Sequence, residues 1–382
     1  MRDARLKITT VLLFNVLILI SCSPGEESRE SETGFQYPAT AQLQQMGTLD
    51  QAGGEFFARP NTVVPIDSER FIIADTQRMR LHLFDGSMNH LHSFGRTGEG
   101  PGEFQRFSEI TYEDGVLRIY DGRAYKVTDL AVAENRMELV SENEFTFYPH
   151  PDFPGAMFWR FAEGPDESHL ALYRDFNIQS QETPRFTRIL GLPYDDQYSP
   201  AADNPAFVFN YTAEVDFRNG ILTIPYYQRG FIDHSNGNVY YAVNDKPEIG
   251  IYNLEGEQTG SMELPDTRMP LSQNEKVDAY EQYYRKSPDP DLFRGEVLPH
   301  IPDERPVIRA MAADAQGRIW VRIYPASDSG PDWLMMDFDG SPLAMISMPD
   351  GHIFRNAFGN TVFTGFDSEE GPRVAIHQMD TL

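Results

Sequence analysis

The sequence is short of cysteine, of positive charge and of long apolar runs, and each shortage excludes a class of protein. Cys22 is the only cysteine among 382 residues, so the chain forms no internal disulfide and no cysteine-based metal site. Asp and Glu number 58 against 32 Lys and Arg, which gives a net charge of −26. Because such a surface repels phosphate backbones, we expect no nucleic-acid partner.

The apolar run near the N-terminus is too short to span a membrane, but it is typical of a secretory signal. Ile8–Ile20 holds 13 mostly apolar residues and follows three basic side chains, whereas a transmembrane helix needs about 20 apolar residues. Leu19–Cys22 resembles the bacterial lipobox, in which the signal is cut and the new N-terminal cysteine is lipidated. An ordinary cleaved signal with an incidental cysteine is the alternative. We predict lipidation of Cys22, because it explains both the single cysteine and its position.

The residues after Cys22 lack the side chains of a folded core. Residues 23–34 are rich in Glu and Ser and hold no aliphatic side chain, which predicts a flexible tether. We therefore divide the chain into a lipoprotein signal peptide (1–21), a flexible acidic tether (22–36) and a folded domain (37–382).

The start of the tether also bears on location. Ser23 rather than Asp after the cysteine resembles outer-membrane lipoproteins, and Glu26-Glu27 resembles the surface-export signal of Bacteroidota lipoproteins. A plain solvated tether is the alternative meaning of the Glu pair. We expect a monomer bound to the outer membrane by its lipid, on the periplasmic or the cell-surface side.

Internal repeats predict the fold. The string FDGS occurs at Phe84–Ser87 and Phe338–Ser341, each time after an apolar run, and Asp-Gly between two such runs is a hairpin signal. Gly54-Glu55-Phe56 precedes Gly102-Glu103-Phe104 by 48 residues. This spacing is typical of one four-stranded propeller blade. We predict an all-β chain that forms a six-bladed β-propeller, with seven blades or a β-sandwich as the alternatives.

The repeats also suggest where the blades lie. Residues 37–50 could add a closing strand to the last blade, and the third blade is poorly defined in sequence. The six candidate blades cover about 56–95, 104–147, 157–225, 228–265, 305–348 and 351–380.

One segment, about 266–304, interrupts the β pattern. Ser272 and Glu275 have the spacing of a capping box, in which each side chain satisfies a free amide of the first helical turn. Val277 and Tyr280 then fall on one face of a helix. We predict an amphipathic helix inserted between two blades. It either packs on the propeller or forms a lid over a binding mouth.

The stretch FGRTGEGPGEF is rich in glycine but does not form a phosphate site. It lacks the Lys-Ser/Thr ending of a phosphate-binding loop, and no helical pattern follows it. We interpret it as a turn between blades, with its last Phe in the interblade core and its Arg and Glu at the rim. Its residues are Gly95, Arg96, Gly98, Gly100, Pro101, Gly102, Glu103 and Phe104.

This string, with the strand-like runs after it, resembles the NHL-repeat-like six-bladed β-propellers of Bacteroidota lipoproteins. The resemblance implies a propeller fold and an envelope location. It implies no single activity, because some distant propeller relatives are enzymes and many only bind. We also expect Arg59 and Arg106 to pair with Glu55 or Glu103 and so to lock adjacent blades.

Few residues point to catalysis. The sequence has no Gly-x-Ser-x-Gly elbow, no His-Glu-x-x-His and no cysteine-based metal spacing, so we assign no catalytic residue, no metal ligand and no cofactor. His90 and His92 could contact a metal from one strand face, with His82 nearby, but surface histidines are far more common.

A calcium site is the alternative that a distant resemblance to sugar-lactone hydrolases implies, because those propellers bind an ion at their centre. Asp75, Asp121 and Asn244 end corresponding strand-like runs. They either converge at one rim, where oxygen atoms suit calcium, or cap turns.

Aromatic residues are abundant, with 26 Phe, 18 Tyr and 3 Trp. They either fill the blade cores or form a stacking platform for a glycan or peptide. Our candidates for ligand contact are Trp159, Tyr227, Tyr284 and Trp320. We expect a lipid-anchored, non-catalytic module that binds a peptide, glycan or protein. The alternative is a metal-dependent hydrolase or lyase with its site in the central channel.

Overall fold

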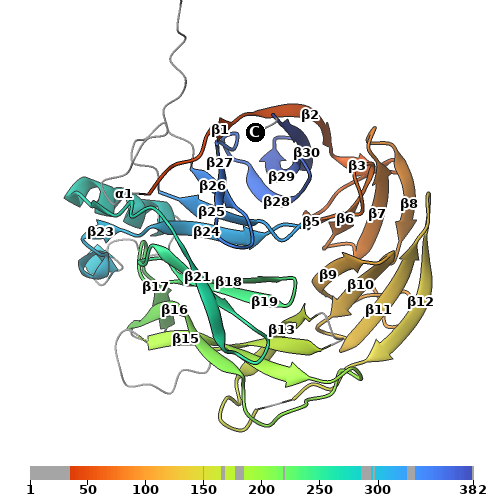
Figure 1. Ribbon diagram of the computed structural model, residues 1–382, viewed down its shortest axis with the longest axis horizontal. Helices are drawn as coiled ribbons and strands as arrows, with labels where there is room; N and C mark the ends of the chain where they lie inside the picture. The colour runs from red at the N-terminus through yellow and green to blue at the C-terminus, as the bar shows by residue number, and fades with distance from the viewer. Residues whose placement is uncertain are drawn as a thin grey trace, which may run out of the picture.

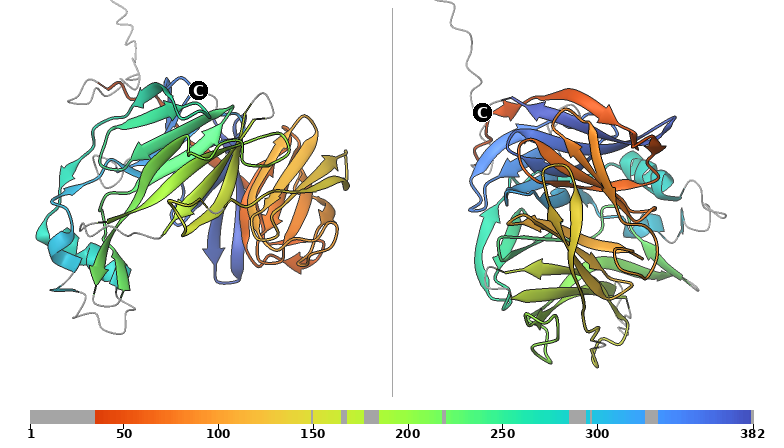
Figure 2. Two further views of the ribbon diagram at one scale, coloured as in Figure 1. Left: turned by 90° about the horizontal axis from the view of Figure 1, so that it is seen from below. Right: turned by 90° about the vertical axis from the view of Figure 1, so that its right-hand side faces the viewer.

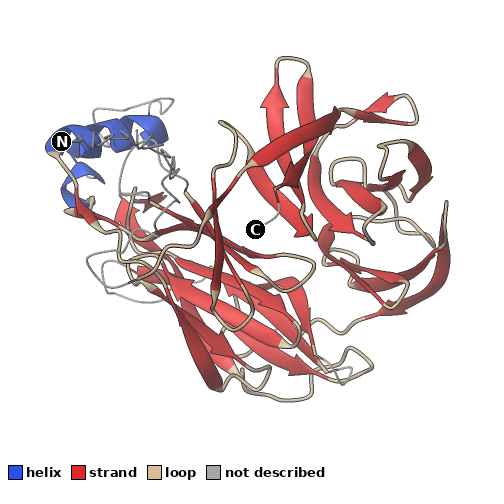
Figure 3. Ribbon diagram, turned by 45° about the horizontal axis from the view of Figure 1, so that its top comes forward, coloured by secondary structure: helices blue, strands red, loops and turns tan. Residues whose placement is uncertain are grey.

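Six large β-sheets are arranged around a common centre (Figure 1), and the described residues also form two small two-stranded sheets. The computed structural model describes residues 35–148, 150–164, 168–176, 185–217, 220–284, 294–295, 297–324 and 332–380. Each large sheet has four or five strands, and strands dominate the whole molecule (Figure 3). The prediction of an all-β, six-bladed propeller with an inserted helix is confirmed.

The first three blades follow one another along the chain. Blade 1 contains β5 (Pro60–Pro65), β6 (Arg70–Asp75), β7 (Arg80–Asp85) and β8 (His90–Phe94). Blade 2 contains β9 (Phe107–Glu113), β10 (Val116–Asp121), β11 (Lys126–Val132) and β12 (Met137–Glu144). Blade 3 contains β13 (Ala156–Glu163), β14 (His169–Asp175), β15 (Arg185–Tyr194), β16 (Phe207–Phe217) and β17 (Gly220–Thr223).

The last three blades complete the ring. Blade 4 contains β18 (Gly230–Ser235), β19 (Asn238–Val243), β20 (Glu248–Tyr252) and β21 (Gln258–Glu263). Blade 5 contains β24 (Ile308–Ala313), β25 (Ile319–Ile323), β26 (Trp333–Met336) and β27 (Pro342–Ile346). Blade 6 contains β28 (Ile353–Phe358), β29 (Thr361–Ser368) and β30 (Gly371–Met379).

The first strand of each blade is the innermost one. Strand β5 contacts β9 and β28, strand β13 contacts β9 and β18, and β18 contacts β24. These strands surround the centre of the ring, as Figure 1 shows.

The N-terminal segment closes the ring. Strand β2 (Leu43–Leu49) pairs antiparallel with β30 and becomes the outer strand of blade 6. Strand β1 (Thr40–Ala41) pairs in parallel with β27 of blade 5. The expectation of a closing strand within residues 37–50 is therefore confirmed. The short β3 (Gln51–Ala52) and β4 (Glu55–Phe56) form a small hairpin before blade 1.

The core lies between the blades, because each sheet buries both of its faces against neighbours. In blade 1, Ile72 and Leu83 pack toward blade 2, whereas Phe71 and Ile73 pack toward blade 6. The period-2 alternation of a strand produces this division directly. Each of the six boundaries between blades holds such an apolar cluster.

The string FDGS lies in the turn between the third and fourth strands of blades 1 and 5, but its two copies differ in register by two residues. The Asp85 amide donates to the Asn89 carbonyl in blade 1, whereas in blade 5 the corresponding bond runs from the Asp337 amide to the Ser341 carbonyl. Asp85 accepts hydrogen bonds from the amides of Ser87 (2.9 Å) and Asn89 (2.8 Å) between β7 and β8. The second copy connects β26 and β27, where Asp339 accepts from the amide of Ser341 (2.9 Å). Both strings are therefore hairpin turns between the third and fourth strands of a blade, as the repeat predicts.

The insertion between blades 4 and 5 contains α1 (Gln273–Tyr284) and the short 3-10 helix η1 (Leu298–His300). The capping box is present, because the Ser272 hydroxyl and the Glu275 amide lie 3.3 Å apart while Glu275 accepts from the Ser272 amide at 2.8 Å. The pairing of β22 (Met269–Pro270) with β23 (Glu304–Arg305) closes the base of the insertion.

One side of α1 packs on the propeller. Tyr280 is buried in a small cluster with Ile224, Leu271, Val297 and Ile301. The insertion lies beside the β16–β17 hairpin at one edge of the ring (Figures 1 and 2). Of the two expected roles, packing on the propeller is therefore observed. No helix among the described residues is both long and apolar enough to cross a bilayer.

Candidate functional site

The glycine-rich loop Phe94–Phe104 is a structural joint between blades 1 and 2. Phe104 is fully buried in the cluster between these blades. Its amide donates to the Arg96 carbonyl at 2.8 Å, and its carbonyl accepts from the Gly98 amide at 3.1 Å. Gly95 has a φ of +87°, and a Cβ there would lie 2.8 Å from the Phe104 ring, so only glycine fits.

The polar residues of this loop remain at the rim. Arg96 Nε donates to Glu103 Oε1 at 2.6 Å. Lys126 of β11 donates to the Glu103 carbonyl at 2.9 Å and to the Glu142 carboxylate at 2.8 Å. The loop uses its own donors and acceptors to hold blade 2, which supports a joint and not a ligand cradle.

Two details of the predicted repeat are wrong. Arg59 and Arg106 do not pair with Glu55 and Glu103, because Glu55 pairs with Arg80 at 3.0 Å and Glu103 pairs with Arg96. The counterpart of Phe104 is Phe57 and not Phe56. Phe57 is buried between blades 6 and 1, while Phe56 is 60% exposed.

The carboxylates at the ends of the second strands explain the true register. Asp75 accepts hydrogen bonds from the amides of Ala58 (2.7 Å) and Arg59 (3.1 Å). Asp121 accepts in the same way from Gln105 (2.6 Å) and Arg106 (3.1 Å). These two carboxylates bind the backbone just before the first strand of each blade. Phe57 and Phe104 each directly precede the two amides that are bound.

In blade 4, the side-chain amide of Asn244 binds the backbone before the first strand in the same way. Its Oδ1 accepts from the Arg229 amide at 2.8 Å, and its Nδ2 donates to the Tyr227 carbonyl at 2.9 Å. Asp75, Asp121 and Asn244 therefore cap turns, the second of the two roles expected for them. Among the residues that the structure describes, no group of three or more His, Cys, Asp or Glu side chains is placed to hold a metal ion.

The histidines of blade 1 share a hydroxyl. His82 Nδ1 lies 2.9 Å from Ser93 Oγ, and His90 Nε2 lies 2.8 Å from the same oxygen. His92 Nδ1 accepts from the Met137 amide at 3.2 Å. Each of the three imidazoles is thus engaged within or between blades.

A charged network joins the inner strands of blades 2 to 5. Arg160 of β13 contacts Asp233 of β18 at 2.9 Å and Glu109 of β9 at 3.6 Å. Asp233 also accepts from the Ala313 amide of β24 at 2.8 Å. Burial raises the pKa of Glu109 to about 7, although the nearby Arg160 opposes this shift. Burial lowers the pKa of His234 to about 4, and Arg160 adds to that effect.

An open pocket of about 390 Å³ lies where the inner strands of blades 4, 5 and 6 begin, and we call it the mouth pocket. Phe231 on β18, Met311 on β24 and Phe354 on β28 contribute to its wall. Its polar side comes from the loop before β18 and from blade 5, with Tyr226, Tyr227, Arg229, Arg309, Arg322 and Tyr324.

The mouth pocket receives one of the four aromatic residues expected to contact a ligand. Tyr227 lines it and is partly exposed. Trp159 lies elsewhere, with the Arg174 guanidinium 3.7 Å and the Arg160 guanidinium 4.5 Å from its ring centre. The side chain of Tyr284 lies outside the described residues.

Trp320 is wrong as a ligand contact. It is fully buried between blades 5 and 6. Its ring stacks on Phe354 with centres 4.6 Å apart, and its Nε1 donates to Asp314 at 2.8 Å. An inner position on a strand that packs against a neighbouring blade favours burial of a large ring.

A neighbouring pocket of about 380 Å³ shares Tyr226, Tyr227 and Gln228 with the mouth pocket and reaches the insertion. Its arginines are engaged by acids: Arg268 pairs with Asp266 at 2.5 Å, and Arg305 pairs with Glu275. The segment Tyr226–Gln228 thus lies between the mouth pocket and a pocket whose arginines are paired with carboxylates.

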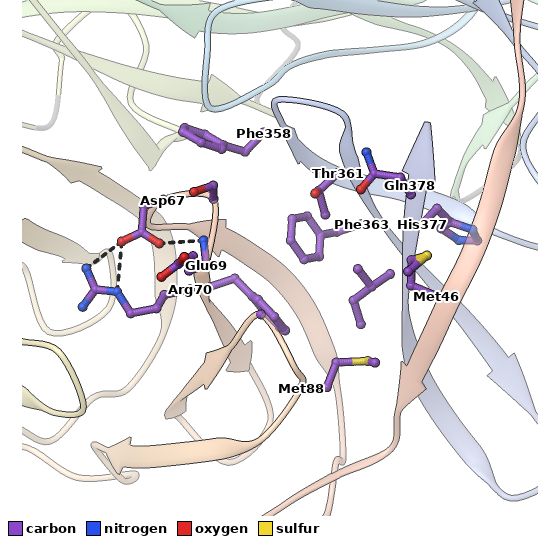
Figure 4. A pocket seen from close by; sticks show the side chains of 14 residues that line it. Met46, Asp67, Glu69, Arg70, Met88, Phe358, Thr361, Phe363, His377 and Gln378 are labelled. Carbon is purple, nitrogen blue, oxygen red and sulfur yellow. Dashed lines mark hydrogen bonds and ion pairs between the residues drawn. The ribbon is translucent and has the colours of Figure 1, made fainter. Parts of the chain in front are cut away.

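A third pocket of about 180 Å³ lies at the seam of blades 6 and 1 (Figure 4). Phe363, Met46 and Met88 face its interior, and Arg70 lies to one side, where its Nη2 donates to Asp67 at 2.7 Å (Figure 4). Phe363 and Met88 of this pocket pack in the apolar cluster of the seam, whereas Met46 is exposed. We therefore take the mouth pocket as the candidate site.

Solved structures resemble the whole chain at low sequence identity. A Bacteroides fragilis protein described as exported superposes with a TM-score of 0.51 and 10% identity, over 90% of this chain and 99% of that one. A DUF4221 family member from Bacteroides vulgatus gives a TM-score of 0.50 and 7% identity, over 89% and 98%. A streptogramin B lyase gives a TM-score of 0.36 and 13% identity, over 89% and 88%.

These likenesses show the fold alone, and the neighbours are β-propellers. No family model and no curated protein matches the sequence. The function must therefore be argued from the site.

Proposed function

We propose that this chain is a cell-envelope binding module, held at the membrane by a lipid on Cys22, which binds its ligand in the mouth pocket without altering it. The observation that carries the proposal is the pocket itself. It is an open cavity of about 390 Å³ at the channel, with aromatic side chains and arginines around it. Sites for small ligands are typically concave, mostly apolar and supplied with a few polar groups.

Local geometry supports this choice of pocket. Tyr226 has a φ of 60°, which is uncommon for a residue other than glycine and is often found at ligand sites. Its ring meets Tyr324 edge to face, with centres 5.8 Å apart. Two aromatic rings, one from the loop before β18 and one from blade 5, thus flank the opening, where they offer faces to a sugar ring or a peptide side chain.

The location in the envelope rests on the N-terminal sequence. The basic segment, the 13-residue apolar run and the lipobox-like Leu19–Cys22 support export and lipidation. The acidic tether would then hold the propeller away from the membrane surface.

The test is a binding screen with the full-length chain purified in detergent. It is applied to arrays of envelope glycans and peptides, beside Tyr227→Ala and the control Phe338→Ala. Tyr227 lines the pocket, whereas Phe338 is an exposed ring on the β26–β27 turn. We expect Tyr227→Ala to weaken binding by about tenfold, a typical loss for an aromatic contact, and Phe338→Ala to leave it unchanged.

The screen also separates binding from catalysis. We expect mass spectrometry to recover the bound ligand intact after long incubation. Conversion of the ligand in the presence of a divalent metal would instead favour the hydrolase or lyase alternative. Equal binding by wild type and Tyr227→Ala would place the ligand site elsewhere.

A further inference from the structure

We infer that the mouth pocket binds a small oxyanion that carries a ring, and that Arg229 and Arg309 hold the anionic group. The inference rests on the proposed binding function and adds the chemical class of the ligand. The shared chemistry is a carboxylate or phosphate joined to a sugar or aromatic ring.

The mouth pocket carries a charge opposite to that of the chain as a whole. The chain carries 58 acidic against 32 basic residues. The described residues that line the mouth pocket nevertheless include Arg229, Arg309 and Arg322, and none of them is Asp or Glu. A concave positive patch on an acidic protein concentrates anions locally, because its walls focus the field.

Two of these arginines, Arg229 and Arg309, have no carboxylate at hydrogen-bond distance among the described residues. Arg229 is exposed, lies over Phe231 with its guanidinium 5.4 Å from the ring centre, and has no carboxylate partner among the described residues. Arg309 lies over Tyr324 at 4.9 Å. Arginine has five N–H donors in a fork that matches carboxylate and phosphate oxygens.

Asp332 is the acid nearest to Arg309, and it is engaged by another residue. Its carboxylate lies 2.6 Å from Arg322 Nε but 3.9 Å from Arg309 Nη1. The Asp332 carboxylate therefore lies near two guanidinium groups, but only Arg322 is within hydrogen-bond distance of it. Arg309 keeps donors for a ligand.

The wall of the mouth pocket also contains a buried hydrogen-bond donor. Trp333 lines the mouth pocket and is only 5% exposed. Its Nε1 is buried and has no hydrogen-bond acceptor among the described residues. Because buried N–H groups are nearly always paired, an acceptor oxygen of a ligand is a fitting partner.

More positive charge lies behind Arg229. Burial lowers the pKa of Arg174, and the nearby guanidinium groups of Arg160, Arg229 and Arg106 lower it further, while Tyr211 opposes them. Asp233 and Glu109 face Arg160 and balance part of this charge. Arg174 and Arg106 thus add positive charge in the neighbourhood of Arg229.

The aromatic residues add the ring to the ligand class. Tyr226, Tyr227 and Tyr324 stand around the opening beside the arginines. A volume of about 390 Å³ suits one or two rings, since pockets for small ligands begin near 300 Å³. A bare inorganic anion would leave these faces without contact.

The experiment measures three probes by isothermal titration calorimetry on the full-length chain. The probes are 4-nitrophenyl β-D-glucuronide, its neutral match 4-nitrophenyl β-D-glucoside, and 4-nitrophenyl phosphate. We expect at least one of the two anions to bind about tenfold tighter than the glucoside, a difference of one charge-assisted contact. The preferred anion distinguishes a carboxylate from a phosphate ligand.

Substitutions then locate the effect. Arg229→Gln and Arg309→Gln should each weaken anion binding about tenfold and leave the glucoside unaffected. Trp333→Phe should weaken it a few-fold, because the ring stays and the donor is lost. The control is Arg136→Gln, an exposed arginine between β11 and β12, and it should bind like the wild type. Unchanged melting temperatures would show that the variants fold.

Two outcomes overturn the inference. One is that neither the glucuronide nor the phosphate binds more tightly than the glucoside, and the other is no binding of either anion at about 10 mM, far above the affinity of a useful site. In both cases the proposed binding function is judged separately, by the effect of Tyr227→Ala in the array screen. Loss of array binding in Tyr227→Ala together with no preference for anions would retain the function and reject this ligand class.

Discussion

The Arg160 guanidinium lies 2.9 Å from the Asp233 carboxylate and joins the inner strands of blades 3 and 4. The two residues are 73 positions apart in the chain. Arg160 also donates from Nη2 to the Ile232 carbonyl at 2.8 Å and faces Glu109 of blade 2. A single cation therefore connects three consecutive blades at the channel.

Replacement of this cation should destabilise the propeller strongly. Arg160→Met leaves the half-buried carboxylates of Asp233 and Glu109 without their counter-charge, so we expect the free energy of unfolding to fall by up to about 3 kcal/mol, the lower end for a broken buried pair. Urea unfolding of the variant and the wild type measures the change. The matched control is Arg136→Gln, which breaks an exposed pair with Glu138 and should cost at most about 0.5 kcal/mol. Equal losses in the two variants would contradict a special role for Arg160.

The pH dependence of stability should reveal Glu109. Its pKa is raised by burial from 4.5 to about 7, so between these values the folded state keeps a proton that the unfolded state has lost. Rising pH then favours unfolding, by up to about 1.4 kcal/mol per pH unit. Glu109→Gln removes the titrating group. Because only the wild type then loses stability as the pH rises, the free energy of unfolding of the variant relative to the wild type should increase from pH 5 to pH 7.

Urea unfolding at several pH values measures this relative stability. The control is Glu138→Gln, an exposed carboxylate of blade 2, whose stability relative to the wild type should stay level. If the difference in free energy of unfolding between Glu109→Gln and the wild type is also independent of pH, Glu109 ionises near its ordinary pKa in the folded protein.

The joint between blades 1 and 2 depends on Phe104. Phe104→Ala leaves a cavity in the cluster that this ring fills, so we expect a loss of about 3–5 kcal/mol in the free energy of unfolding. Phe56→Ala removes an exposed ring and should cost less than about 0.5 kcal/mol. Thermal or urea unfolding compares the two. Similar losses would restore the register in which Phe56 is the counterpart of Phe104.

Calcium should leave the protein unchanged. We expect melting temperatures in millimolar calcium and in excess chelator to agree within about 1 °C, because an ion that binds only the folded state would raise the melting temperature. Differential scanning calorimetry measures both conditions. A rise of several degrees with calcium would favour the metal-dependent alternative.

Cys22 should control the location of the protein. In the parent cell, we expect the wild type in the membrane fraction and the Cys22→Ser variant in soluble fractions, because the lipid is the predicted anchor. Metabolic labelling with a fatty acid should mark only the wild type. Recovery of Cys22→Ser in the membrane fraction with unchanged yield would refute the lipid anchor.

The sequence predicted the fold because a propeller repeats its local chemistry. Two FDGS turns, a spacing near 48 residues and one capping box are all short-range signals, and each describes a unit that forms next to itself in the chain. The alignment of the repeated Gly-Glu-Phe strings differs from the structural alignment by one residue. The strings match Phe56 to Phe104, whereas the backbone amides bound by Asp75 and Asp121 match Phe57 to Phe104.

The candidate site was only partly predictable. Tyr227 was expected at a ligand site, and it lines the mouth pocket. Trp320 was expected there as well, although it is buried between blades 5 and 6. Alternation along a strand shows that one of two neighbouring rings faces the core, but it does not show which face meets another blade.

By itself the sequence determined the blade repeat, the closing strand, the helix cap and the acidic character of the chain, because these depend on neighbouring residues or on composition. Only the tertiary structure decided where the positive charge gathers. Arg229, Arg309 and Tyr227 come from different blades or from the loop between them, and no spacing in the chain indicates that they meet. They meet because the closed ring brings the starts of β18, β24 and β28 to one mouth.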